Sequence, residues 1–139
     1  MIQVGMVPTE QLVQVWEEVM PMIERALQYT GGRFTMQNVL ADLLTGNQTL
    51  WIAIEDQEII GCTTISITQY PGLKALVYEH LGGENVTRWL DEGHRVCSHY
   101  AKHLGCTVLE CQGRSGWKPF LEKLGYRQYA VRYECKIED

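Results

Sequence analysis

The segment from residue 74 to residue 112 constrains the fold of this chain most strongly. Lys74 to Leu81 is a β-rich run, and Gly82-Gly83-Glu84-Asn85 forms a turn that ends on a good helix N-cap. Helical spacing of apolar residues then predicts a helix from Val86 to Leu104, and Thr107 to Gln112 is a further short strand. A strand, a helix and a strand within about 40 residues form a βαβ unit, whose strands lie parallel with a right-handed crossover.

The remaining segments complete a mixed sheet around this unit. We predict strands at Gln3–Val7, Leu50–Ile54, Ile59–Thr68 and Tyr126–Ile137, a helix after Thr9 with its apolar stripe from Leu12 to Leu27, and helices at Thr35–Thr45 and Trp117–Leu124. Apolar residues at helical spacing, β-branched runs and glycine stops carry these assignments. The order is β-α-α-β-β-β-α-β-α-β, an α/β (α+β) fold in which helices cover a central mixed sheet. Nothing marks a boundary, so residues 1–139 are predicted to be a single domain.

The length and the charge of the chain limit the classes of partner that we expect it to bind. The 139 residues include 12 Lys and Arg against 17 Asp and Glu, a formal net charge of −5, whereas a nucleic-acid-binding domain normally has a basic excess. We therefore expect no nucleic acid partner. The first residues show no secretory pattern, and no apolar run approaches the ~20 residues that cross a bilayer, so we expect a cytoplasmic protein without a membrane partner.

Cysteines and histidines do not form a metal or disulfide pattern. The five cysteines are odd in number and contain no C-x-x-C pair, which favours reduced thiols in the core. His99 and His103 are four residues apart on a helix with His94 nearby, but no third ligand has a suitable spacing. We expect no metal. Cys111 has no histidine beside it in the sequence and is not expected to be a nucleophile.

The junction from Glu79-His80-Leu81 into Gly82-Gly83 is the candidate ligand site. In an open α/β sheet the ligand crevice lies beyond the carboxyl ends of parallel strands, and a helix begins here. Two glycines allow close approach of a ligand, and the free N–H groups of the first helical turn suit a phosphate. The alternative is that the glycines only form a tight strand-to-helix turn.

The segment Phe120-Leu121-Glu122-Lys123-Leu124-Gly125-Tyr126 looks like the aromatic-Tyr-x-x-Leu-Gly-Phe ending of the last helix in the GNAT family of acyl-CoA-dependent N-acetyltransferases. The element order resembles the same family over nearly the whole chain. The resemblance implies acetyl-CoA as acyl donor, an amine on a small molecule or a protein as acceptor, and a strand at 74–81 that offers its backbone to the pantetheine arm.

The same resemblance implies which residues form the site. Residues that would bind acetyl-CoA are His80, Leu81, Gly82, Gly83, Asn85, Val86, Thr87 and Arg88, with Trp117 and Phe120 as a stacking surface, and Glu79 or Glu110 would be the base. Trp117 and Phe120 are also spaced to clamp the last helix onto the sheet, and Glu79 could equally be a solvent-facing strand residue. Arg88, Arg114 and Lys118 are the cations nearest in sequence to these turns.

Two departures from the family pattern leave the function open. Leu121 stands where many members carry a tyrosine that protonates the leaving thiolate, and Glu84 puts a negative charge into a phosphate loop that lacks the family's regular glycine spacing. The acidic net charge gives no compensating attraction. One hypothesis is an N-acetyltransferase, and the other is a non-catalytic binding or structural protein with a degenerate CoA site.

A short run, Gly-Arg-x-Gly-Trp before a helix that ends in Leu-Gly-Tyr, looks like GNAT-like proteins of tailed bacteriophages and prophages. That resemblance implies a host-cytoplasmic or virion location for the non-catalytic alternative, with a virion partner or a homo-oligomer. A third hypothesis is a regulator that binds CoA without turnover.

Overall fold

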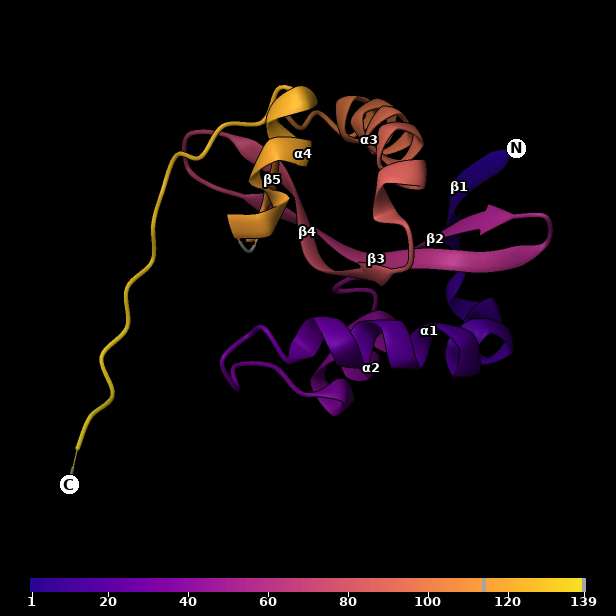
Figure 1. Cartoon of the computed structure of the whole chain (residues 1–139), viewed down its shortest axis with the longest axis horizontal. Helices are drawn as coiled ribbons and strands as arrows, with labels where there is room; N and C mark the ends of the chain where they lie inside the picture. The colour runs from indigo at the N-terminus through magenta and orange to yellow at the C-terminus, as the bar shows by residue number, and fades with distance from the viewer. Residues whose placement is uncertain (114, 139) are drawn as a thin grey trace.

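The computed structural model describes residues 1–113 and 115–138 and shows a five-stranded mixed sheet with helices on both faces (Figure 1). The strands are β1 (Ile2–Val7), β2 (Thr49–Glu55), β3 (Glu58–Gln69), β4 (Lys74–Gly83) and β5 (Val108–Cys111), in that spatial order. The helices are α1 (Leu12–Leu27), α2 (Met36–Thr45), α3 (Val86–His103) and α4 (Lys118–Lys123), with single 3-10 turns at η1 (Thr9–Gln11) and η2 (Ser115–Trp117). The predicted α/β architecture is confirmed.

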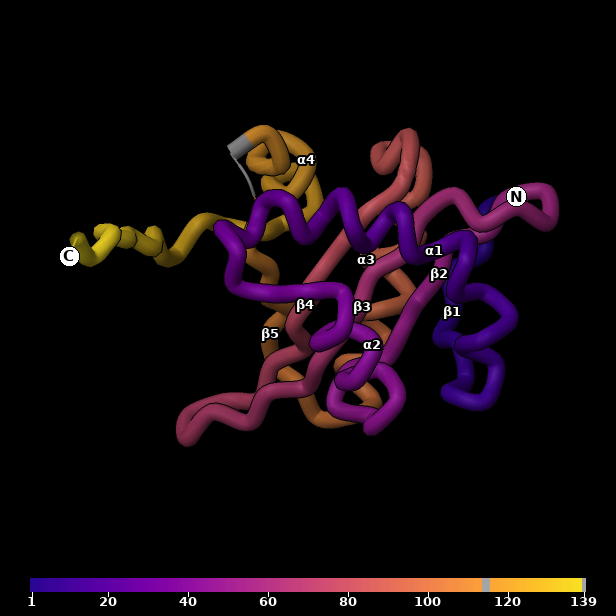
Figure 2. Tube along the Cα trace, turned by 90° about the horizontal axis from the view of Figure 1, so that it is seen from below, coloured from indigo at the N-terminus to yellow at the C-terminus, as the bar shows by residue number. Residues whose placement is uncertain are grey.

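The two faces of the sheet bury two separate cores, and the helices divide between them. Helices α1 and α2 cover one face, where Val19, Ile23 and Leu43 pack against Leu50 of β2 and Cys62 of β3. Figure 2 shows α1 lying across β3 and β4. Helices α3 and α4 lie over the other face (Figure 1). Among the residues described, no helix is long and apolar enough to cross a membrane.

The second core lies under α3, and a tryptophan of this helix, Trp89, is buried beside β3. Cys97 and Ala101 pack on Trp51, Ile65 and Leu76 of the sheet. In the first turns of α3 the buried residue is Trp89, 4% exposed, whereas Leu90 and Gly93 are half-buried. The indole of Trp89 lies against Gly61 of β3, where an added Cβ would overlap the ring. Trp89 can be buried at this position because Gly61 has no side chain and leaves room for the indole.

The βαβ unit forms as predicted, and its strands are parallel. Strand β4 pairs with β5 from Ala75–Val108 to Tyr78–Cys111, and α3 connects the two. The other neighbours are antiparallel, including the β2–β3 hairpin, whose turn residues Asp56 and Gln57 both have positive φ. Two consecutive positive φ values are typical of a type I′ hairpin turn.

Strand β4 contains a β-bulge that decides which side chains face which core. Thr64 of β3 is opposite His80, and the next residue, Ile65, is opposite Tyr78, so Glu79 is an extra residue on β4. An extra residue reverses the alternation of the side chains that follow it. Tyr78 consequently packs in the α3 core, whereas His80 contacts Phe34 on the α1–α2 face.

The two glycines that end β4 are required by packing. A Cβ on Gly82 would overlap the carbonyl group of Met22 in α1, with the carbonyl carbon 2.9 Å away. Gly83 has φ 138°, and a Cβ there would lie 2.6 Å from the Cα of Gly61. These glycines therefore let α1 and β3 approach the end of β4 closely.

The predicted last strand, Tyr126–Ile137, is wrong. Residues 126–138 carry no strand and run as an extended tail from α4 to the C-terminus, clear of the sheet (Figures 1 and 2). The alternating pattern of this segment is that of a strand, but a strand also needs a partner edge to supply its hydrogen bonds, and the tail turns away from β5.

Replacing Gly82 with alanine should destabilise the fold, because the new methyl group meets backbone rather than a movable side chain. We expect the free energy of unfolding to fall by about 1–3 kcal/mol, the usual cost of overpacking. Chemical denaturation of G82A measures it. The matched control is Gly5→Ala in β1, where nothing lies within 4 Å of the new Cβ and the change should stay within about 0.5 kcal/mol. Equal effects in the two variants would contradict this explanation of Gly82.

Candidate functional site

The strands β4 and β5 separate at the point where the sequence predicted a ligand crevice. Their last paired residues are Tyr78 and Cys111, and β5 ends there, whereas β4 continues for five residues to Gly83. Among the residues that the structure describes, no strand pairs with the side of β4 that faces away from β3 between Glu79 and Gly83. Backbone N–H and C=O groups along such an edge can hydrogen-bond an extended ligand.

Helix α3 begins directly beyond this open edge. Asn85 occupies the N-cap position with φ 50° and makes no side-chain capping hydrogen bond. The first-turn residues Val86 and Thr87 follow it, and the N–H groups of a helix's first turn favour an anion. The open edge of β4 and the start of α3 thus form one continuous polar surface. Leu81 lies within the open edge and is half-buried.

The charged residues of this loop are not arranged around the helix start. Arg88, a residue that the family resemblance placed in the phosphate loop, forms an ion pair with Glu55 at the end of β2. Glu84 is exposed, and its backbone N–H donates to the Ile60 carbonyl. An anion at the start of α3 would therefore be held by backbone N–H groups and the helix dipole.

Both predicted bases lie in the same part of the sheet, around Tyr70. Glu79, the bulged residue of β4, accepts a hydrogen bond from Ser66 Oγ at 3.0 Å. Glu110 of β5 accepts one from the Tyr70 hydroxyl at 2.8 Å. This bond to Glu110 raises the pKa of Tyr70, and the charge of Glu79 adds to the shift. Two carboxylates, each oriented by a hydroxyl donor, therefore share one region of the surface.

These carboxylates face the α1–α2 side of the sheet. Glu110 is level with Val77 of β4, and the neighbouring pair Leu76 and Leu109 points into the α3 core. Because side chains alternate along a strand, Glu110 points to the opposite face. The candidate base Glu110 and the open edge of β4 thus lie on different sides of the point where the strands separate.

His80 is buried, and its side chain is not part of the open edge. It is 4% exposed, and its ring contacts Phe34 edge-on with the ring centroids 5.1 Å apart. Burial lowers its pKa, and the nearby Asp42 opposes that shift. Its Nε2 atom and the hydroxyl of Thr64, which is opposite it on β3, have no hydrogen-bond partner among the residues described. His80 was predicted to bind CoA, but only its backbone, and not its side chain, lies at the open edge of β4.

A hydroxyl network lies at the separation of the strands and was not predicted. The Tyr78 hydroxyl is hydrogen-bonded to Tyr126, and the Tyr126 hydroxyl is 3.0 Å from Nδ1 of His94 in α3. Burial raises the pKa of Tyr126 to about 12 and lowers that of His94, so both groups are neutral at pH 7. Tyr126 belongs to the Leu-Gly-Tyr ending, but its partners are more than thirty residues away, and no local pattern connects them.

The aromatic residues at α4 border the same region. Trp117 is half-buried against Gly113, and Phe120 is 37% exposed. Leu121 is half-buried, and its carbonyl accepts the Tyr126 N–H at 3.0 Å, which closes the helix. The cation Lys118 begins α4 and is exposed, whereas Arg114 lies outside the described residues.

A hollow of about 560 Å³ opens between α1 and α2 on the face that carries the carboxylates. Its lining is mixed apolar and polar and consists of Met20, Glu24, Leu27, Gln28, Phe34, Thr35 and Met36. Phe34 links it to His80, the neighbour of Glu79. A pocket of this size and lining suits a small molecule.

The cysteines and histidines do not add a reactive centre. Burial raises the pKa of Cys62 to about 12 and that of Cys97 to about 11, so both remain thiols at neutral pH. Burial also raises the pKa of Cys111. In the part of the chain that the structure covers, no three His, Cys, Asp or Glu residues are grouped so that they could hold a metal ion.

Comparison with solved structures shows which known proteins share this fold. An aminoglycoside acetyltransferase from an uncultured soil metagenomic sample matches with a TM-score of 0.73 at 15% identity, over 99% of each chain. A second such enzyme from a soil sample, in complex with sisomicin, matches with a TM-score of 0.69 at 10% identity, over 99% of this chain and 97% of the other. A probable acetyltransferase matches with a TM-score of 0.72 at 13% identity, over 99% of each. The fold is therefore that of GNAT-type acetyltransferases.

Comparison of the sequence with family models and with curated proteins finds no match.

Because burial lowers the pKa of His80 and of His94, we expect the protein to lose stability in mild acid. The unfolded chain takes up protons below about pH 6.5, before the folded histidines do, so the free energy of unfolding falls as the pH drops from 7 to 5.5. Each group can contribute at most about 1.4 kcal/mol per pH unit. Urea unfolding at several pH values measures the slope.

The control for this pH dependence is His80→Phe, which keeps an aromatic ring against Phe34 and removes one titrating group. Its slope should be shallower than that of the parent. If the slopes of the parent and the variant were the same, the prediction for His80 would be wrong.

Proposed function

We propose that this protein transfers the acetyl group of acetyl-CoA to an amine. The observation that carries the proposal is the separation of β4 from β5 after Tyr78 and Cys111, which leaves the edge of β4 open up to the start of α3. The fold shared with acetyltransferases supports it. A cytoplasmic location, where acetyl-CoA is available, goes with this function.

In this proposal the backbone binds the donor. The amides of the pantetheine arm hydrogen-bond the open edge of β4 from Glu79 to Gly83, and the pyrophosphate lies against the N–H groups of Val86 and Thr87. Asn85 shapes the turn through its positive φ. Arg88 is already paired with Glu55, so fixed dipoles, which net charge does not cancel, provide the anion binding. The half-buried Trp117 and the exposed Phe120 would form the stacking surface for the bound arm in this proposal.

The chemistry is a direct transfer within a ternary complex. The amine nitrogen attacks the acetyl carbonyl carbon, a C–N bond forms and the C–S bond breaks, and CoA leaves as a thiolate that takes up a proton. The nitrogen gives its own proton, directly or through a water, to Glu79, which Ser66 orients. Glu110 is the second candidate for this role, held by Tyr70.

The step that this chain handles differently is protonation of the thiolate. The side chain of Leu121 has no acidic proton to donate. A general acid that protonates a leaving group contributes about 10²–10⁴-fold in rate. We propose the Tyr126 hydroxyl, which is paired with His94, as the proton donor for this step. We therefore propose a slow enzyme rather than an inert one.

The acceptor approaches from the α1–α2 face. The hollow there is lined in part by Glu24, and Glu79 and Glu110 lie on the same side of the sheet. Carboxylates attract a polyamine cation, and the net charge of −5 increases its encounter rate. A small cationic amine, such as the aminoglycosides of the structural neighbours, is the acceptor class that we propose.

A second function is favoured by Leu121 and by the Arg88–Glu55 pair: a protein that keeps the fold and binds without turnover. A virion or host-interaction role belongs to this alternative. Acetyl-CoA binding with no thiol release toward any amine would support a CoA-binding regulator, and no acetyl-CoA binding at all would support a structural protein.

Thr87→Glu should weaken acetyl-CoA binding, because it places a negative charge in the first turn of α3 beside the proposed pyrophosphate position. We expect the dissociation constant, measured by calorimetry, to rise about tenfold, the effect of one adverse charge contact worth ~1.4 kcal/mol. The matched control is Thr107→Glu, an equally exposed threonine just before β5, which should leave the affinity unchanged. Equal affinities for the two variants would refute this site.

Glu79→Gln should lower kcat/KM about 10²-fold or more, if a base of ordinary efficiency is removed. The measurement is thiol release from acetyl-CoA with sisomicin, spermidine and a lysine peptide as acceptors. Glu58→Gln, in the exposed β2–β3 turn, is the matched control and should keep full activity. If Glu79→Gln is as active as the control while Glu110→Gln is not, the base is Glu110.

A further inference from the structure

Two polar side chains are buried next to each other in the sheet without a hydrogen-bond partner. Thr64 of β3 lies directly opposite His80 of β4, and the two residues are 0% and 4% exposed. Among the residues that the structure describes, neither the hydroxyl of Thr64 nor Nε2 of His80 has a partner. Buried polar groups without partners cost stability, and native proteins contain few of them. The pair therefore points to a role other than packing.

Both side chains point to the face of the sheet that α1 and α2 cover. Thr64 lies two residues after Cys62, which packs in the core under these helices, and residues at this spacing share one face of a strand. His80 contacts Phe34, which lies between the two helices. The pair thus lies in the same layer as the hollow between α1 and α2.

A single aromatic side chain separates the pair from this hollow. Phe34 is 41% exposed and lines the hollow together with Thr35 and Met36. The same ring contacts the His80 ring edge-on, with the ring centroids 5.1 Å apart. A turn of the Phe34 ring therefore connects the hollow with the buried imidazole and the hydroxyl beside it.

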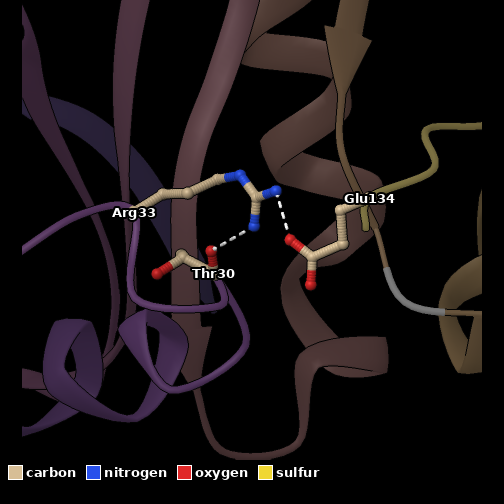
Figure 3. A network of polar contacts seen from close by, with 3 residues as sticks. All are labelled: Thr30, Arg33 and Glu134. Carbon is tan, nitrogen blue, oxygen red and sulfur yellow. Dashed lines mark hydrogen bonds and ion pairs between the residues drawn. The ribbon is translucent and has the colours of Figure 1, made fainter. Parts of the chain in front are cut away.

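The backbone that carries Phe34 is held on both sides. Arg33 donates from its backbone N–H and from Nη1 to the Thr30 carbonyl, at 3.3 Å each, and from Nη2 to Glu134 at 2.5 Å (Figure 3). On the other side, Thr35 is the N-cap of α2 and makes a capping hydrogen bond. Uncovering the pair therefore requires rotation of the Phe34 side chain rather than movement of the loop. Exposed side chains change rotamer within nanoseconds.

We propose that Thr64 and His80 form a hydroxyl-binding subsite of the acceptor pocket, which opens when the Phe34 ring turns aside. This inference rests on the proposed acetyl transfer, in which the acceptor enters the hollow between α1 and α2. A hydroxyl group of the acceptor donates its proton to Nε2 of His80 and accepts one from Thr64, so one group satisfies both. The acceptor class is accordingly an amino alcohol, an amine with a hydroxyl group at some distance from the reacting nitrogen.

The burial of the pair favours a hydroxyl over a second ammonium group or a methyl group. A charge is far more costly to bury than a hydroxyl, unless a counter-charge receives it. Asp42 is a carboxylate near His80, but it already accepts a hydrogen bond from Gln48 at 3.3 Å. A methyl group would leave both polar atoms unpaired, and sites with buried polar groups discriminate strongly against such ligands.

The test compares amines that differ only at the end far from the reacting nitrogen. Hexylamine, aminopentanol and diaminopentane carry a methyl, a hydroxyl and an ammonium group on the same five-carbon chain, and shorter and longer series cover other spacings. In thiol release from acetyl-CoA, the parent should prefer the best amino alcohol to its methyl analogue by at least about tenfold in kcat/KM. Thr64→Val should remove most of this preference. Its fold should hold, because valine replaces a buried hydroxyl that has no partner.

The matched control is Thr63→Val. Thr63 is the neighbour of Thr64 in β3, is also buried at 6% exposure and points to the opposite face. T63V should keep the preference of the parent. An equal change of preference in T64V and T63V would mean that the pair only packs or holds a water molecule, and would overturn the proposal. So would a parent that prefers hexylamine or diaminopentane to aminopentanol at every chain length.

NMR of the histidine rings separates failure of the subsite from failure of the proposed transfer, because it needs neither acetyl-CoA nor turnover. The Nε2 chemical shift of His80, assigned by its loss in His80→Phe, should move when the amino alcohol is added and stay when its methyl analogue is added. A shift without thiol release would support the hydroxyl subsite and overturn the acetyl transfer. Thiol release without the shift would support the transfer and overturn the subsite, and the absence of both would overturn both.

Discussion

The extra residue at Glu79 in β4 is the constraint on which the rest of this structure depends. An uninterrupted strand would place Tyr78, His80 and Gly82 on one face. The bulge instead leaves Tyr78 in the α3 core and turns His80 toward Phe34 and Gly82 toward α1. Because β4 changes course here while β5 ends at Cys111, the strands separate and an open backbone edge results. The same residue thereby affects the packing of both helical layers and stands where the open edge of β4 begins, the edge that leads to the start of α3.

Much of this fold could be read from the sequence, because its signals are local. The hairpin at Asp56 and Gln57, the helix stops and the βαβ order depend on the periods and turns of short segments. The open edge of β4 and the start of α3 beyond it could be predicted for the same reason, since the end of a parallel strand and the start of a helix are both visible in the pattern. Glu79 and Glu110 were predicted as alternative bases, and both carboxylates lie around Tyr70.

The rest depended on contacts that no local pattern contains. The pairing of Tyr126 with His94 and Tyr78 joins three elements, and Arg88 was expected at the phosphate loop but is paired with Glu55 across the sheet. Trp89 is buried because Gly61, on another strand, leaves it space. The last strand was mispredicted for a related reason: alternation within a segment does not report whether a neighbouring strand edge is available to pair with it.

Tyr126 connects the candidate site with the tail. Its hydroxyl is held at the separation of β4 and β5, and the tail begins at the next residue, so the direction in which the tail leaves is fixed by a side chain of the site itself. Anything that tightens or loosens the strand separation acts on this anchor and on the Cys111 end of β5, where the separation begins. The acidic face around Glu110 also lies on β5. The candidate base Glu110 and the Cys111 end, where the open edge of β4 begins, thus share one four-residue strand, and a shift at one is felt at the other because packed elements move together.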